Sequence, residues 1–176
     1  MGIFNSTLIL LKEKKAPASM ILELNENLKS IGILLQKSDY ARIIFNDSRN
    51  EEEKEPITLQ KSHTDEEVIG LLSSWKGLGL LSYRHINIEF PFLINYISWD
   101  DQYLQGLEIS YQLSAENYTN RDHIKDDILL KIIEFINPLL AVGSIGNSED
   151  EFRVDLGLEY NLDYIKNKKF DIDIRL

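Results

Sequence analysis

The three histidines of the sequence are the first candidates for catalysis or metal binding, because imidazole is a common acid–base group and the commonest metal ligand. They are His63, His85 and His123. Asp126 and Asp127 follow His123, and a spacing of four residues places His123 and Asp127 on one face of a helix. One hypothesis is therefore a metal-assisted hydrolase or nuclease that uses His123, Asp126 and Asp127. The structural interpretation is that acidic residues in the first turns of a helix simply complement the helix dipole.

Motifs for nucleophilic catalysis and for phosphate binding are absent from the sequence. It contains no cysteine, no G-x-S-x-G turn, no S-x-x-K and no H-E-x-x-H. Asp47, Glu52 and Lys54 follow each other as in some nucleases, but a catalytic site needs rigid support, and segment 47–56 has no apolar side chains to provide it. We therefore predict a mobile loop over 47–56, and a protein that is not an enzyme and has no cofactor.

An acidic and aromatic segment is the most distinctive feature of the chain. There is no lysine or arginine between Arg84 and Arg121, over 36 residues, while this stretch contains five acidic and seven aromatic residues. The net charge is about −1 over residues 1–60, −5 over 61–120 and −4 over 121–176. The acidity is therefore concentrated in the last two thirds of the chain.

Acidic strand faces with aromatic anchors are suited to binding a basic protein. Complementary charge accelerates association, and tyrosine and tryptophan are frequent hot spots of interfaces. We predict that the partner-binding residues lie on polar strand faces and at a hairpin tip. They are Glu89, Trp99, Asp100, Asp101, Tyr103, Glu108, Asp155 and Glu159. The alternative is that these acids are ordinary solvent-facing residues of half-buried strands.

Helices that could position these residues are predicted from apolar spacing and capping residues. Beyond Pro17, apolar residues recur every three or four positions, which predicts a helix that ends near Gly32. Thr64 and Glu67 form a capping box at the start of a second helix. A third helix is expected to start near residues 119–122 and to end or kink at Asn137 and Pro138.

Strands are predicted where apolar and polar residues alternate. The pattern favours strands over 40–45, over 86–99 with an interruption at Pro91, and over 107–113, the last two forming an antiparallel pair. Residues 152–162 and 170–176 predict a C-terminal hairpin, and residues 3–11 fit either a strand or a helical turn. The expected fold is a single α+β domain over residues 1–176, with an antiparallel sheet and two to three helices packed on one face.

Composition narrows the classes of partner. The chain has 29 acidic and 19 basic residues, a net charge of −10, which argues against gripping nucleic acid through its phosphates. No segment approaches the ~20 apolar residues of a membrane span. We expect a cytoplasmic protein that binds neither nucleic acid nor membranes.

In these properties the chain resembles bacterial immunity proteins, the inhibitors paired with polymorphic or contact-dependent growth-inhibition toxins. The resemblance is one of type: a small, acidic, cysteine-free α+β chain with the residue usage of an AT-rich gene and no catalytic motif. The resemblance depends mainly on the acidic aromatic segment 86–118 and on the acidic C-terminal hairpin. It implies an antitoxin that binds a cognate basic toxin, often a nuclease, and covers its active site or a nearby surface. A self-associating structural module, pairing through an exposed strand edge, is a further alternative.

Overall fold

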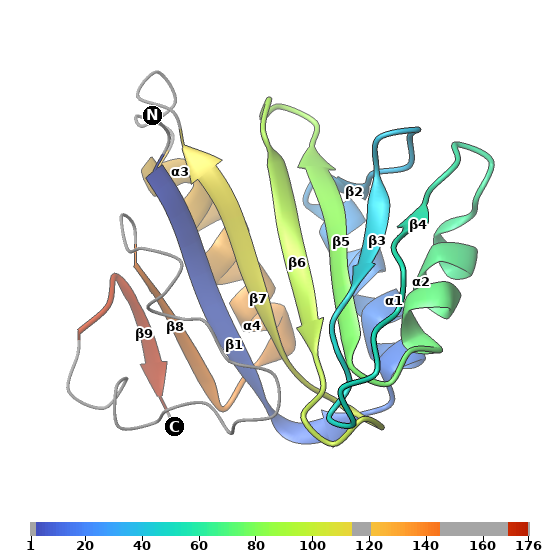
Figure 1. The fold of residues 1–176 in the computed structure, drawn as a ribbon. Coiled ribbons are helices and arrows are strands. Elements are labelled where there is room, and N and C mark those ends of the chain that lie inside the picture. The colour runs from blue at the N-terminus through green and yellow to red at the C-terminus, as the bar shows by residue number, and fades with distance from the viewer. Residues whose placement is uncertain (1–2, 114–120, 145–168, 176) are drawn as a thin grey trace.

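A nine-stranded antiparallel sheet organises the part of the chain that the computed structural model describes, which is residues 3–113, 121–144 and 169–175. The order of the strands is β4-β3-β5-β6-β7-β1-β8-β9, and β2 also pairs with β5 (Figure 1). The strands are β1 (Ile3–Lys15), β2 (Ile33–Leu35), β3 (Arg42–Phe45), β4 (Ile57–Thr58), β5 (Leu78–His85), β6 (Pro91–Ile97), β7 (Leu104–Leu113), β8 (Leu140–Ser144) and β9 (Ile172–Arg175).

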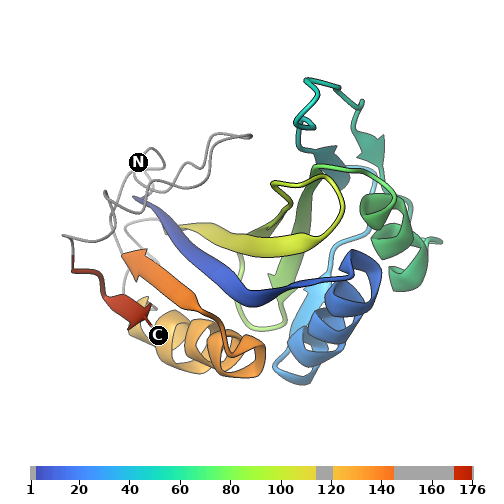
Figure 2. The same cartoon turned by 90° about the horizontal axis from the view of Figure 1, so that it is seen from below.

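The helices cover one face of this sheet. They are α1 (Pro17–Ser30), α2 (Asp65–Ser73) and a third helix built from α3 (Arg121–Ile124), a π-helical turn (Lys125–Leu129) and α4 (Leu130–Ile136). Figure 2 shows the sheet curved over them, with its other face carrying none of the described helices. This arrangement confirms the α+β fold predicted from the sequence. No helix among the described residues is long and apolar enough to cross a membrane.

The main hydrophobic core lies between the helices and the sheet. Leu24 and Leu28 of α1, Val68 of α2 and Ile128 of the third helix are each at most 1% exposed and pack in one cluster with the inward side chains of the central strands. Burial of one such side chain stabilises the fold by about 1.5–3 kcal/mol. A second, smaller cluster lies on the helix-free face. Its members are Leu8, Leu10, Ile97, Trp99, Leu140, Val142 and Phe170.

The predicted helix ends are confirmed. Helix α1 stops at Ser30, and Gly32 follows with a φ of +83°, a conformation that glycine adopts without a steric penalty. At the start of α2 the amide of Glu67 donates to Thr64 Oγ1 at 3.1 Å, and the amide of Thr64 donates to Glu67 Oε2 at 2.7 Å. The third helix ends at Asn137, which has a φ of +49°.

One strand prediction was wrong, and one strand was not predicted. Residues 86–90 form a turn, with Ile86 67% exposed, and the strand precedes them as β5, whose side chains alternate in burial from Gly79 to His85. Strand β9 pairs with β8, which was not predicted as a strand. The first half of the predicted C-terminal hairpin, residues 152–162, lies outside the described residues. The ambiguous N-terminal segment is a strand, β1, which extends through the charged residues to Lys15.

Asp65 ties α2 to α1 and to the segment after β2. Its carboxylate accepts hydrogen bonds from Lys37 at 2.7 Å and from the buried Asn25 amide at 3.0 Å, and it pairs with Lys29 at 2.9 Å. Burial alone would raise the pKa of Asp65, but the hydrogen bonds from Lys37, Asn25 and Lys29 outweigh it and lower the pKa to about 2. The ionised carboxylate therefore stabilises the folded protein above its unfolded pKa near 4, and this contribution is lost as the pH falls toward 2.

We expect Asp65→Asn to lower the free energy of unfolding by about 2 kcal/mol at pH 7, because a neutral amide cannot balance the charges of Lys29 and Lys37. The difference from wild type should shrink between pH 4 and pH 2, where the wild-type carboxylate becomes protonated. Denaturant unfolding at pH 7, 4 and 3 measures this. The matched control is Glu66→Gln, an exposed neighbour, which should change the free energy by less than about 0.5 kcal/mol. A difference that stays constant at acid pH contradicts the assignment.

Candidate partner-binding surface

Two acidic loops meet at one end of the sheet, the lower end in Figure 1. Residues 46–56 connect β3 to β4, and residues 98–103 connect β6 to β7. The backbone amide of Arg49 in the first loop donates to both carboxylate oxygens of Asp101 in the second, each at 3.2 Å. We call residues 46–56 and 98–103 the acidic loop pair. Its halves are distant in the sequence, and the sheet brings them together.

The close approach of β3 to β5 sets the position of the first loop. Phe45 lies opposite Gly79, and a Cβ atom at Gly79 would lie 2.2 Å from the carbonyl oxygen of Ile44. Only glycine therefore fits at position 79. Asn46 follows, with its amide N–H donating to the Leu78 carbonyl at 2.8 Å and its side chain donating to Asn95 Oδ1 at 2.9 Å. These bonds direct the chain across the end of β6.

Hydrogen bonds and a cation–π contact then connect loop 46–56 to itself and to its neighbours. The indole N–H of Trp75 donates to the Asn46 carbonyl at 2.5 Å. Ser48 is 4% exposed, and its amide donates to the Glu52 carbonyl at 3.0 Å. Lys54 Nζ lies 4.5 Å from the ring centre of Phe45. The loop has few apolar side chains of its own, and these contacts connect it to Trp75 and Phe45.

Asp100 organises the second loop. One of its carboxylate oxygens accepts hydrogen bonds from the amides of Gln102 at 3.1 Å and Tyr103 at 3.0 Å, and the other lies 2.5 Å from Lys14 Nζ. Burial would raise the pKa of Asp100, but the hydrogen bonds from Lys14 and from these two amides lower it below its usual range. Asp100 therefore stays ionised and fixes the loop. Asp101 follows with a φ of +62°.

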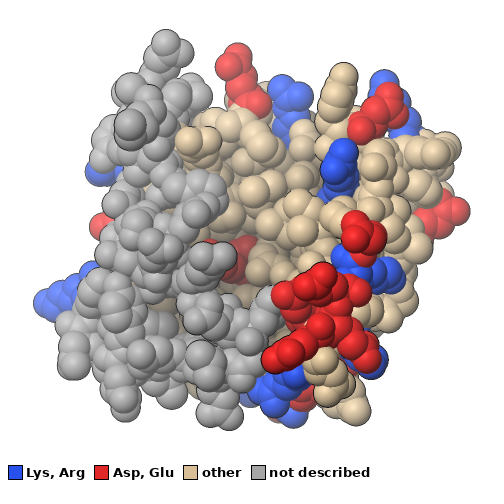
Figure 3. Space-filling view, viewed as in Figure 1, with Lys and Arg blue, Asp and Glu red and all other residues tan. Residues whose placement is uncertain are grey.

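The acidic loop pair has a net charge of −5, from seven acidic and two basic residues. Two lysines outside it make ion pairs with it, Lys14 with Asp100 and Lys76 with Glu52, the latter at 3.1 Å. Glu51 and Glu53 are exposed, and neither has an ion-pair partner among the described residues. Figure 3 shows acidic side chains gathered at this corner of the helix-free face.

The structure brings some of the predicted partner-binding residues together and separates others. Asp100, Asp101 and Tyr103 share the acidic loop pair, and Tyr103 is 44% exposed. Trp99 belongs to the same loop but is 7% exposed, so it supports the surface from below. Glu89 lies at the opposite end of the sheet, in the turn between β5 and β6.

Glu108 lies between these two ends. It is half-buried on the helix-free face of β7, opposite Leu8 and Asn95. Asp155 and Glu159 lie outside the described residues. Sequence reasoning missed the acids of loop 46–56, although the run of three glutamates at 51–53 was a visible signal.

Of the three residues of the alternative metal site, the structure brings His123 and Asp127 into contact. His123 Nδ1 lies 2.5 Å from Asp127 Oδ2, as the four-residue spacing predicted, and both side chains are half exposed. Within residues 3–113, 121–144 and 169–175 there is no group of three or more histidine, aspartate or glutamate side chains arranged to hold a metal ion.

Comparison of the chain with family models, curated proteins and solved structures finds no match.

The bond between the two loops can be tested by hydrogen exchange. We expect Asp101→Gly to accelerate exchange of the Arg49 amide by about three- to tenfold, because the amide loses a charged acceptor. Glycine tolerates the positive φ of this position, so the change adds no backbone strain. Asp101→Asn, which keeps one acceptor oxygen, should have a smaller effect. Exchange of the Asn46 amide, which is bonded to Leu78, should stay unchanged. An unchanged Arg49 rate would show that the loops are not joined through Asp101.

Proposed function

We propose that this protein is an immunity protein, which binds a cognate basic toxin through the acidic loop pair and neutralises it without turnover. The observation that carries this proposal is the Arg49–Asp101 contact, which joins two acidic loops into a single surface. The exposed carboxylates of Glu51 and Glu53 then face solvent beside those of the second loop.

A surface fixed before binding favours tight association. Ordering flexible loops on binding costs free energy, and the hydrogen bonds of Asn46, Ser48 and Asp100 reduce that cost. Uncompensated negative charge attracts a basic partner and accelerates the encounter. Tyr103 adds an exposed aromatic ring of the kind that frequently anchors interfaces.

The proposed toxin is a nuclease. An enzyme that acts on nucleic acid needs lysine and arginine side chains to hold the phosphate backbone. A rigid acidic surface complements that site and competes with its substrate. Inhibition would then follow from occupancy alone, which requires no catalytic group in the inhibitor.

We expect the double change Glu51→Lys and Glu53→Lys to abolish protection against the toxin and to weaken binding at least tenfold, because it replaces two attractive charges by two repulsive ones. The toxin to be tested is the product of the gene beside that of this protein. Growth of cells that coexpress the two proteins measures protection, and calorimetry measures binding.

The matched control is Asp126→Lys with Glu134→Lys, the same charge change at exposed residues of the third helix. It should protect cells as wild type does. Equal loss of protection in both double variants would show that the loss follows from the change in net charge alone, and would contradict the assigned surface. A wild-type protein that does not bind the toxin would contradict the proposed function itself.

A further inference from the structure

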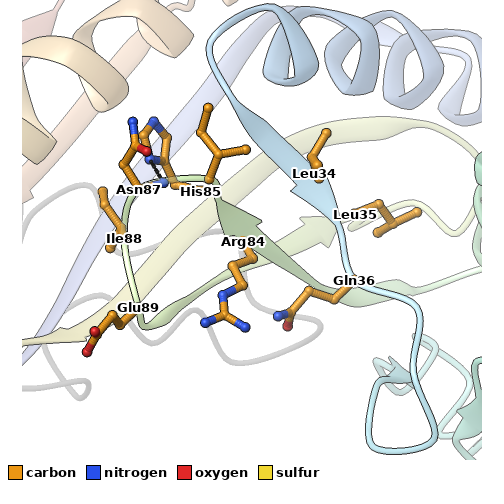
Figure 4. Close-up of a pocket in the computed structure, with 9 residues that line it drawn as sticks. Leu34, Leu35, Gln36, Arg84, His85, Asn87, Ile88 and Glu89 are labelled. Atoms are coloured by element: carbon orange, nitrogen blue, oxygen red, sulfur yellow. Dashed lines mark hydrogen bonds between the residues drawn. The ribbon is translucent and has the colours of Figure 1, made fainter.

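His85, the last residue of β5, is the buried histidine among the three of the chain, and it is 9% exposed. The backbone amide of Asn87 donates to its Nδ1 atom at 3.1 Å. Figure 4 shows this bond at the start of the turn 86–90, with the ring on the opposite side of β5 from Arg84. An amide N–H can bond only to a ring nitrogen that carries no proton. The contact therefore requires His85 in its neutral form.

The turn 86–90 is attached to the end of β5 and to the residue after α1. The amide of Ile88 donates to the His85 carbonyl at 3.3 Å, and the amide of Ile86 donates to the Gly32 carbonyl at 2.9 Å. Ile88 is 7% exposed and belongs to the main hydrophobic core. The bond from Asn87 to the ring therefore helps to fold the turn in the conformation that buries Ile88.

The elements around the ring contribute few charges. The end of α1 contributes the Ile31 carbonyl, with which the ring forms a hydrogen bond, and β2 contributes the apolar Ile33. The third helix contributes His123, which is a second cation when it is protonated. The side chains of Arg84 and Glu89 extend away from the ring (Figure 4).

These surroundings disfavour the charged imidazolium. Burial lowers the pKa of His85 below its ordinary value of 6.5, the charge of His123 lowers it further, and the bond to Ile31 opposes both. The neutral ring therefore contributes stability above pH 6.5, and this contribution is lost as the pH falls through the pKa of the folded protein. A proton on Nδ1 then faces the Asn87 N–H, and two donors cannot bond to each other.

We propose that His85 is a pH-sensitive latch for the turn 86–90. The neutral ring accepts the Asn87 amide and holds the turn closed over the core, whereas the imidazolium releases the turn and frees Ile88. The turn lies at the opposite end of the sheet from the acidic loop pair, so the latch does not depend on the proposed function.

The test is NMR of the isotope-labelled full chain between about pH 8 and about pH 4, a range that brackets the ordinary pKa of histidine. Ring nitrogen shifts follow the protonation of His85, and hydrogen exchange gives the protection factor of the Asn87 amide, which corrects for the pH dependence of exchange itself. We expect this protection to fall about tenfold as His85 is protonated, with the same midpoint. The amide of Gln36, which is bonded to the Ser82 carbonyl, should keep its protection.

His85→Asn keeps an acceptor oxygen near the position of Nδ1 and removes the titration, so protection of the Asn87 amide should no longer depend on pH. The matched control is His63→Asn. His63 Nδ1 also accepts a backbone amide, that of Gln60 at 2.9 Å, and its replacement should leave the response of the turn unchanged.

Constant protection of the Asn87 amide while wild-type His85 titrates would overturn the proposal, and this measurement decides even if His85→Asn does not fold. A fall with the same midpoint in His85→Asn would also overturn it, because another group would then control the turn. So would a response that disappears in His63→Asn.

Discussion

The contact between β3 and β5 at Gly79 is the constraint on which the candidate surface depends. Gly77 and Gly79 lack side chains where the backbone from Ile44 to Asp47 passes within van der Waals distance. That approach lets Asn46 bond to Leu78 and Asn95, and so places the following loop beside the loop after β6. The Arg49–Asp101 bond can form only because of this placement. Two runs of acidic residues become one surface as a consequence of backbone packing.

The two faces of the sheet differ in what packs against them. One face packs against α1, α2 and the third helix and supplies most of the buried apolar area. Asp65 adds a polar tie between α1, α2 and the segment after β2 on that side. The other face carries no described helix, and the acidic loop pair lies at one of its ends.

Local patterns in the sequence were sufficient to predict the helices and part of the sheet. The capping box at Thr64 and the glycine after α1 are local, and both were predicted correctly. Strand β5 was missed because the adjacent Leu80 and Leu81 hide its alternation, whereas apolar and polar residues alternate in the turn 86–90 as they would in a short strand. Asp100 and Asp101 were predicted as partner-binding residues, but the acidic residues of loop 46–56 were not. Its anchors, Trp75 and Asp101, are contributed by other parts of the chain, so no local pattern reveals them.

We propose that the acidic loop pair attracts and holds a basic toxin, and the association rate of the two proteins reports this attraction. Stopped-flow measurement at ~20 to 500 mM salt should give a rate constant that falls steeply with ionic strength, because screening removes the attraction between exposed charges. The variant with lysine at 51 and 53 should associate more slowly at low salt and approach the wild-type rate at high salt. Wild-type association that does not respond to salt, or a variant as fast as wild type at low salt, would contradict the account.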